Sequence, residues 1–361
     1  MLCLVYLCVF AGVFSSFARG NTQRGSGAPE QKPVELAEAV PAARDDPSGK
    51  VEVELVSLVL DSQEAAPEPA ADAGLSAASL GTGFPPEQSR VETPPSRAEV
   101  VMKALAAGYP DRLGEAVYRN GDWAVPVRGV WYYYAEGRLL PEELRGKAAE
   151  YDPQPFYNYP EKLPPWRTPG PEENARFRAQ TKQQEQHPPK RSQHFYDALF
   201  RAHTKAESYD RLKTIRMFGK QVLVHYSIME ELALVEERLL AESRTNALVR
   251  QWINGINTLE TWNWRSIAAT ETRSYHAYGV ALDFLPKSTK LATYWRWTAE
   301  AQPEWWTVPY EKRFHPPEAV IRAFEAYGFI WGGKWSFYDT MHFEYRPEIL
   351  ILNNLPISDI R

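Results

Sequence analysis

Cysteine is nearly missing from this chain: of its 361 residues, only Cys3 and Cys8 carry a thiol. Both lie at the extreme N-terminus, so no disulfide framework can hold the rest of the chain together. The same shortage excludes a cysteine nucleophile and a cysteine-rich zinc site in the remainder of the protein. Any metal site there must be built from histidine and carboxylate side chains.

Neither positive nor negative side chains are in large excess. The formal net charge is only -5, and no run of lysine and arginine forms a basic stripe. Proteins that bind nucleic acid depend largely on such positive patches. The sequence therefore predicts that nucleic acid is not a partner.

The long apolar run near the N-terminus, residues 2–17, is short for a membrane span. A bilayer helix needs about 20 apolar residues, whereas a run of this length suits the core of a signal peptide. Ser16-Phe17-Ala18 resembles a cleavage site, so residues 1–18 are predicted to be a signal peptide. Because no basic residue precedes the run, an uncleaved membrane tether is the alternative. Either interpretation predicts a secreted protein, periplasmic or at the cell surface.

Composition divides the remaining chain. Residues 19–99 are rich in Ala, Pro, Glu and Ser, which is typical of a disordered linker because such a segment buries little apolar surface. Tryptophan and tyrosine concentrate after residue 107. We predict an N-terminal extension over residues 100–219, packed on a C-terminal domain over residues 220–361. Nothing in the sequence indicates the oligomeric state.

Hydrophobic periodicity predicts both helices and strands in the C-terminal part. Ser227 and Glu230 form a capping-box pattern, and the apolar spacing that follows predicts a helix over about 228–243. The expected fold class is α+β, a small antiparallel sheet with flanking helices. The other expected helices are residues 246–254 and the segment after Pro317, and the expected strands are 123–127, 130–134, 258–267, 278–285, 329–331 and 341–345.

A histidine and an aspartate stand close together in Ser274-Tyr275-His276-Ala277-Tyr278-Gly279-Val280-Ala281-Leu282-Asp283. His276 lies in a predicted loop and Asp283 on a predicted strand, and Gly279 lets the backbone bend between them. Asp283 faces away from the apolar side chains of Leu282 and Phe284. Taken alone, this spacing also fits an ordinary hydrogen bond between a histidine and a carboxylate.

A second segment changes that balance. Asp339-Thr340-Met341-His342-Phe343 places another histidine and another carboxylate at the start of a predicted strand. Catalytic zinc favours three protein ligands and one open position. His276, Asp283 and His342 meet that requirement, and Asp339 remains as a candidate general base.

Together the two segments resemble the D-alanyl-D-alanine carboxypeptidase family of zinc peptidases. That family includes VanY-type and VanX-type enzymes and L-alanyl-D-glutamate endopeptidases, and it shares its zinc-site architecture with lysostaphin-like peptidases and the hedgehog signalling domain. The resemblance covers residues 220–350, and the run Trp331-Gly332-Gly333-Lys334-Trp335 is similar to that of the endopeptidase branch. It implies that Zn2+ is the cofactor, with His276, Asp283 and His342 as ligands.

The resemblance also implies roles for residues around the metal. Asp339 would be the catalytic base, and an arginine before the first histidine would stabilise the developing oxyanion or anchor the substrate. Arg265 fits that position best, and Arg273 competes with it because it lies closer to His276. Ser274 and Trp335 are the expected substrate contacts, and for Ser274 a turn-stabilising role is equally consistent with the pattern.

The implied activity is hydrolysis of peptide bonds in peptidoglycan stem peptides, which would be the partners of the site. Carboxypeptidase and endopeptidase activities both occur in enzymes with this signature. A zinc-bearing module that binds the cell wall without catalysis is the alternative, as the hedgehog relative illustrates. Asp339 favours the enzyme, because a binding module needs no base.

Overall fold

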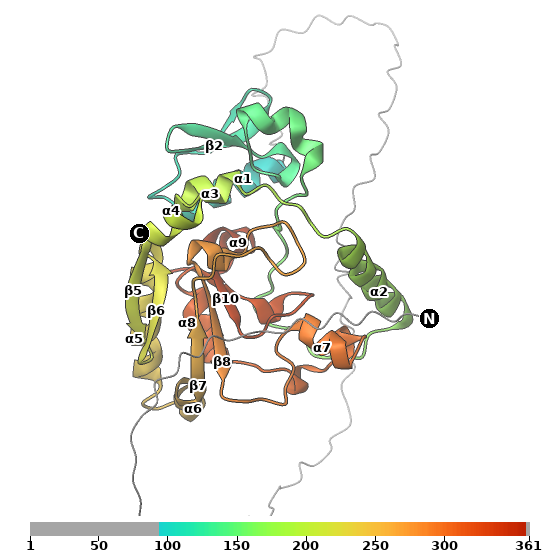
Figure 1. The fold of residues 1–361 in the computed structure, drawn as a ribbon, viewed down its shortest axis with the longest axis vertical. Coiled ribbons are helices and arrows are strands. Elements are labelled where there is room, and N and C mark those ends of the chain that lie inside the picture. Colours follow the sequence, from blue (N-terminus) through green and yellow to red (C-terminus); the bar gives the residue numbers. More distant parts are fainter. Residues whose placement is uncertain (1–93, 359–361) are drawn as a thin grey trace, which may run out of the picture. The chain divides into compact units, whose positions relative to one another are not determined.

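The computed structural model describes residues 94–358, and these fall in one compact unit (Figure 1). The predicted signal peptide and the predicted linker as far as residue 93 lie outside the described residues. The first helix, α1 (Arg97–Gly108), starts within the last residues assigned to the linker, because the Ser96 side chain caps it by accepting from the backbone N–H of Glu99. No helix within residues 94–358 is long and apolar enough to cross a bilayer.

A four-stranded antiparallel sheet in the order β1-β2-β3-β4 follows α1. The predicted hairpin is confirmed, since β2 pairs with β3 and the turn between them is Arg128-Gly129. The elements of this part are β1 (Val117–Arg119), β2 (Asp122–Val127), β3 (Val130–Tyr133), η1 (Ala135–Gly137), β4 (Leu140–Pro141) and η2 (Glu142–Glu150).

Residues 153–170 contain no helix or strand, yet parts of this segment are deeply buried. The Tyr159 hydroxyl donates to Glu325 at 2.6 Å and accepts from the backbone N–H of Trp331 at 2.8 Å. These contacts fix the segment to the C-terminal sheet. The elements that follow it are α2 (Pro171–Gln186), α3 (His194–Phe200), α4 (Lys205–Asp210), β5 (Leu212–Met217) and β6 (Lys220–His225).

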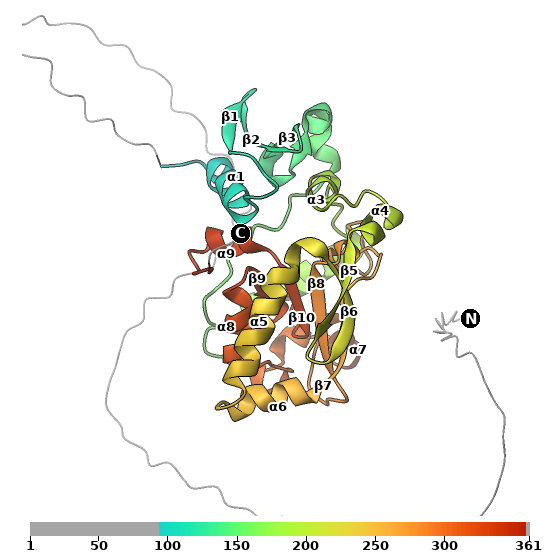
Figure 2. The ribbon, with the colours of Figure 1, turned by 90° about the vertical axis from the view of Figure 1, so that its left-hand side faces the viewer.

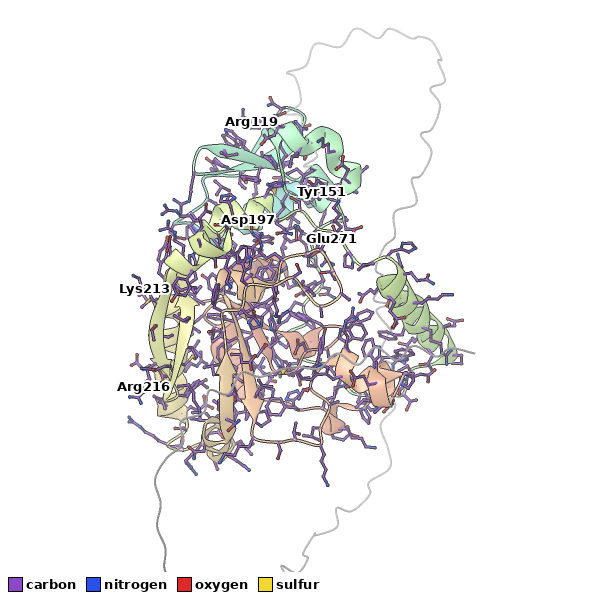
Figure 3. All side chains as sticks on the ribbon, viewed as in Figure 1. Arg119, Tyr151, Asp197, Lys213, Arg216 and Glu271 are labelled. Atoms are coloured by element: carbon purple, nitrogen blue, oxygen red, sulfur yellow. The ribbon has the colours of Figure 1, made fainter. Side chains whose placement is uncertain are left out.

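Strands β5 and β6 form a hairpin whose turn is Phe218-Gly219, so the predicted boundary at residue 219 falls inside this hairpin. Lys213 and Arg216 on β5 are exposed at the outer side of this hairpin (Figure 3). Neither strand was expected from the sequence, although alternating apolar residues run through β6.

The C-terminal part is built on a second four-stranded antiparallel sheet in the order β7-β8-β10-β9. Figure 2 shows α5 and α8 beside this sheet, with α6 near the start of β7. The α+β class with a small antiparallel sheet and flanking helices is thus confirmed. The elements are η3 (Tyr226–Ile228), α5 (Met229–Glu242), α6 (Ala247–Gly255), β7 (Ile256–Glu260), η4 (Tyr275–Tyr278), β8 (Ala281–Pro286), α7 (Trp295–Ala301), η5 (Trp305–Thr307), η6 (Tyr310–Lys312), α8 (Glu318–Glu325), β9 (Phe329–Trp331), η7 (Gly332–Lys334), β10 (His342–Tyr345) and α9 (Pro347–Leu352).

The two faces of this sheet differ in chemistry. Leu282 and Phe284 on β8 and Phe343 on β10 are at most 1% exposed and pack in the main apolar core with α5 and α8. Alternate residues of the same strands point to the opposite face. That opposite face carries the polar side chains of the candidate site.

Two expectations about local structure are wrong. The strand expected over 258–267 ends at Glu260, because the next carbonyl, that of Thr261, bonds to the His276 ring instead of a neighbouring strand. Helix α5 begins as expected, but its N-cap is Ile228 and no side chain caps it. The Ser227 hydroxyl, which was expected to cap this helix, lies 2.7 Å from Nδ1 of His225.

Candidate metal centre

The turn before β8 presents His276. Ser274 caps it by accepting from the backbone N–H of His276 at 3.4 Å, and one 3-10 turn follows. Gly279 then adopts a positive φ of 72°. A Cβ at this position would lie 2.6 Å from Leu212 Cδ2 and 3.0 Å from the backbone N of His225, so only glycine fits without a shift.

Strand pairing brings the other two residues of the group together. His342 on β10 is the direct cross-strand partner of Asp283 on β8. Side chains of paired residues lie on the same face of an antiparallel sheet, within about 5.5 Å at Cβ. The register of two strands far apart in sequence therefore places the carboxylate beside the imidazole.

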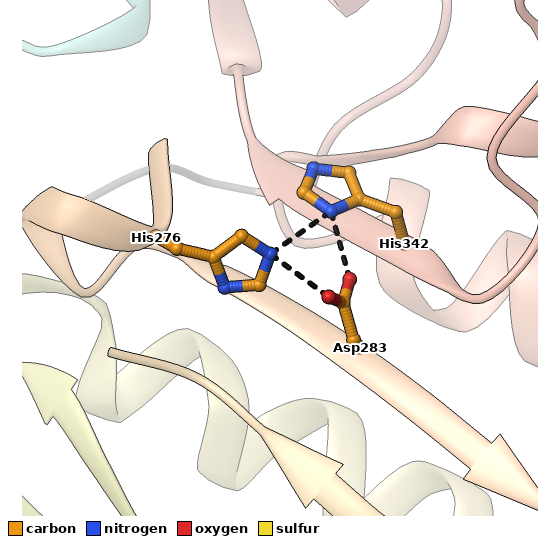
Figure 4. A group of neighbouring side chains, drawn as sticks. All are labelled: His276, Asp283 and His342. Atoms are coloured by element: carbon orange, nitrogen blue, oxygen red, sulfur yellow. Dashed lines mark hydrogen bonds and ion pairs between the residues drawn. The ribbon is translucent and has the colours of Figure 1, made fainter. Parts of the chain in front are cut away.

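His276, Asp283 and His342 converge on one point (Figure 4). Nε2 of His276 lies 3.2 Å from Nδ1 of His342 and 3.2 Å from Oδ2 of Asp283, and Nδ1 of His342 lies 2.9 Å from Oδ1 of Asp283. All three side chains are buried. Donor atoms around a four-coordinate zinc with bonds of about 2.1 Å stand roughly 3.4 Å apart, so this spacing suits such an ion.

The outward-facing nitrogens of both imidazoles are already engaged. Nδ1 of His276 lies 2.5 Å from the Thr261 carbonyl, and Nε2 of His342 lies 3.1 Å from Oε2 of Glu344. An N–H at each of these positions leaves the inward nitrogen with a lone pair. Fixing the tautomer in this way is what metal-binding histidines require. The donor set therefore fits Zn2+.

Electrostatics at the three residues also favour a cation. Burial opposes ionisation of Asp283, but the adjacent imidazoles of His276 and His342 hold its pKa well below the usual range. Burial likewise opposes charge on His342, whereas hydrogen bonds to Asp283 and Glu344 raise its pKa well above the ordinary value. The pocket thus favours positive charge at its centre, which a metal ion supplies.

Asp339 lies at the edge of the same group. Burial raises the pKa of its carboxyl to about 7, and the nearby charges of His342, Asp283 and Arg265 act on it. Its Oδ1 is buried and makes no hydrogen bond to any residue between 94 and 358. A buried carboxylate oxygen without a partner is free to accept a proton from a substrate or water.

The structure separates the two arginine candidates. Arg265 lines a cavity of about 240 Å³ together with His276 and Asp283. Arg273 forms an ion pair with Asp197, which lies on α3 (Figure 3), and covers the Trp264 ring at 4.3 Å. Arg273 is therefore committed to holding the fold, and the geometry favours Arg265 as the functional arginine.

The two expected substrate contacts lie in different surroundings. Ser274 is 5% exposed and caps the turn that carries His276, which matches the turn-stabilising alternative. Trp335 is half-buried, and its ring centre lies 5.4 Å from that of His342, at the metal side of the sheet. Contact of either residue with a substrate stays a prediction.

Some supporting groups had no signal in the sequence. The Thr261 carbonyl acts through its backbone, so residue type does not reveal it. Arg346 and Glu348 are wholly buried charges, and only their tertiary neighbours show what they do. Glu344 lies on β10 two residues after His342, on the same face of the strand, and this spacing was visible in the sequence.

Comparison with protein families agrees with this geometry. Residues 268–345 match the D-alanyl-D-alanine carboxypeptidase family model. The match contains the turn, both strands and all three residues of the candidate metal centre, and it supports a peptidase of this family for that part of the chain. Residues 101–156 match a second model, described as a domain of unknown function (DUF8518). No curated protein and no solved structure matches the chain.

Proposed function

We propose that this protein is a zinc-dependent peptidase that hydrolyses bonds in peptidoglycan stem peptides. The observation that carries the proposal is the buried group of His276, Asp283 and His342 with the unpartnered carboxylate of Asp339 beside it. The family match supports the substrate class. Zinc bound by the three residues would supply a positive charge that polarises a carbonyl and makes water more acidic.

The side chains around the ligands have separate tasks in this proposal. Asp339 accepts a proton from the attacking water and returns it to the leaving amine, which positioned acid–base groups do with a gain of about 10²–10⁴-fold. Arg265 lies across the cavity, where its guanidinium stabilises the negative charge that develops on the carbonyl oxygen. Trp335 lies beside His342, where its ring would contact one side of the peptide substrate.

The proposed activity is tested with the full chain, loaded with zinc and incubated with defined muropeptides. Mass spectrometry of the products shows whether terminal D-alanine is released, as for a carboxypeptidase, or whether the peptide is cut internally, as for an endopeptidase. A chelated sample is the control and should be inactive. Absence of any cleavage by protein that carries stoichiometric zinc would contradict the proposal.

The second candidate, a zinc-bearing module that binds the cell wall, predicts the opposite pattern. Such a module would retain zinc and bind muropeptides without turnover. Oδ1 of Asp339 favours the enzyme, because a buried carboxylate oxygen that no residue between 94 and 358 hydrogen-bonds costs stability, and a catalytic role would account for that cost.

We further propose that the protein acts outside the cytoplasm, where its substrate lies. The predicted signal peptide, or its alternative as a membrane tether, would bring it to the periplasm or the cell surface. Cell fractionation should find the protein with the envelope or in the medium. Full-length protein in the cytoplasm would argue against export.

Replacing Arg265 with alanine should lower kcat or raise KM by about 10²–10³-fold, because one donor to the developing charge is lost. Zinc content should stay stoichiometric, since Arg265 is not a ligand. Steady-state kinetics with a muropeptide, together with metal analysis, measure both effects. Arg216→Ala, on the exposed side of β5, is the matched control and should behave as the unmutated protein.

Gly332 permits the close approach of the loop that carries Asp339. A Cβ at Gly332 would lie 2.5 Å from the Asp339 carbonyl oxygen and 3.1 Å from the Trp335 ring. Gly332→Ala should therefore displace Asp339 and reduce turnover by about 10²-fold, the effect of a misplacement of roughly 1 Å.

The control for this substitution is Gly146→Ala, because nothing lies within 4 Å of a Cβ built at Gly146. Zinc affinity should be retained in both variants, and kinetic assays beside metal titrations measure the outcome. Unchanged turnover in Gly332→Ala would show that the position of Asp339 is not critical.

A further inference from the structure

A series of buried charged side chains leads away from His342. Oε2 of Glu344 lies 3.1 Å from Nε2 of His342, and Oε1 of the same carboxylate lies 3.5 Å from Nη1 of Arg346. Nε of Arg346 in turn donates to Oε1 of Glu348. Arg346 and Glu348 have no exposed surface, and Glu344 is 6% exposed. We call Glu344, Arg346 and Glu348, together with Tyr109, the charge relay.

The relay ends in the N-terminal part of the chain. The Tyr109 hydroxyl donates to Oε2 of Glu348 at 2.9 Å, and the Tyr109 side chain is wholly buried. The end of α1 comes close enough for this because Gly108 has no side chain: a Cβ there would lie 3.0 Å from the backbone N of Glu348. Arg346 also donates to the Pro155 carbonyl at 3.5 Å.

Both N-terminal contacts come from residues 101–156, the part that matches a domain of unknown function. Arg346 also lies over the ring of Tyr275, 5.0 Å from its centre, and Tyr275 directly precedes His276. The relay therefore connects this N-terminal part with the elements that carry both histidines of the candidate metal centre.

Burial of so many charges calls for an explanation other than stability. A buried ion pair is often no more stabilising than apolar side chains of the same shape, since desolvation cancels much of the attraction. The carboxylates of Asp283, Glu344 and Glu348 with the one guanidinium of Arg346 leave two negative charges. A divalent cation between His276 and His342 neutralises them.

We propose that the charge relay positions His342 for metal binding, and that the N-terminal part of the chain serves the metal centre through Tyr109. Tyr109 and Arg346 hold Glu348, the fixed guanidinium orients Glu344, and Glu344 accepts the N–H at Nε2 of His342. Nδ1 then faces the metal with its lone pair. These are positioning residues, because none of them belongs to the group that could hold the metal and each acts through another side chain.

The inference rests on the metal-binding half of the proposed function and not on peptide hydrolysis. Its test is a titration of the full metal-free protein with Zn2+, and with Co2+ whose visible absorption reports ligand geometry. Glu344→Gln should weaken Zn2+ binding by about 10–100-fold, as removal of such a partner typically does. Glu348→Gln and Tyr109→Phe should weaken it in the same direction by at least about threefold, and all three should shift the Co2+ spectrum.

Tyr159→Phe is the matched control. Tyr159 is equally buried and also donates to a carboxylate, that of Glu325 at 2.6 Å, but it lies outside the relay. Both tyrosine variants lose one hydroxyl and should lose comparable thermal stability. Only Tyr109→Phe should lose metal affinity and alter the Co2+ spectrum.

Three results would overturn the inference. Equal metal affinities for Tyr109→Phe and the unmutated protein would show that the relay does not reach the N-terminal part. Equal losses in Tyr109→Phe and Tyr159→Phe would reduce the effect to general destabilisation. An unmutated protein that binds no divalent metal would refute the proposed function together with the relay, whereas metal binding without hydrolysis would leave the relay standing.

Discussion

His276→Ala should abolish both stoichiometric zinc and peptide hydrolysis. His276 supplies one of the three donor atoms that residues 94–358 bring together, and the Thr261 carbonyl fixes its ring. The loss of zinc affinity should exceed about 100-fold, which is the upper value for mutating a group that only hydrogen-bonds to a metal ligand. Metal analysis after dialysis and muropeptide turnover measure the two effects.

The control for this substitution is His203→Ala, because His203 is exposed and lies outside the group. It should retain both zinc and activity. Stoichiometric zinc in His276→Ala would show that the metal binds elsewhere.

Asp339→Ala should separate chemistry from metal binding. The three ligands stay in place, so zinc should remain stoichiometric, while loss of the base should lower kcat by about 10²–10⁴-fold. Asp339→Asn preserves shape and removes the proton acceptor, so it should be similarly impaired. Asp339→Glu should recover part of the rate, because it restores a carboxylate.

Kinetics and metal analysis of the same preparations decide this outcome. Near-normal turnover in Asp339→Asn would refute the assignment of the base. Loss of zinc in Asp339→Ala would instead make Asp339 part of the metal site.

The candidate metal centre was predictable because its determinants are local. A turn residue, a glycine and alternation along one strand place His276 and Asp283, and these features can be recognised in ten consecutive residues. The motif also supplied His342, and the register that pairs it with Asp283 follows from two short strands with apolar residues on their other face.

Features that depend on distant contacts were not predictable. The carbonyl of Thr261 ends β7 by bonding to His276, so the strand expected to continue to Ile267 does not. Ser227 bonds to His225, and the N-cap of α5 is Ile228. For β7 the competing partner is the ring of His276, which lies beyond the reach of any strand pattern, whereas for Ser227 it is the near neighbour His225, whose side chain competes with the helix for the hydroxyl.

The same reason hides the charge relay. Tyr109 and Glu348 are far apart in the chain. Each lies at the end of a helix, where a tyrosine or a glutamate is not unusual. Only the packing of α1 against α9 brings the hydroxyl to the carboxylate. The periodicity of apolar residues along a strand or a helix carries no information about which distant residues form such a pair.

The buried network of Tyr159, Glu325 and Lys334 has a consequence for how this protein can be divided or transplanted. Lys334 bonds to Glu325 at 2.6 Å and to the Glu161 carbonyl at 2.6 Å, so residues on both sides of α2 complete its coordination. A fragment limited to residues 268–345 would lack the Glu161 carbonyl that accepts from Lys334 and the Arg346 guanidinium beside Glu344, and buried charges that lose their partners are costly. Gene fusions that exchange only the metal-bearing segment should therefore yield insoluble protein, and productive exchanges should carry the chain from Arg97 onward.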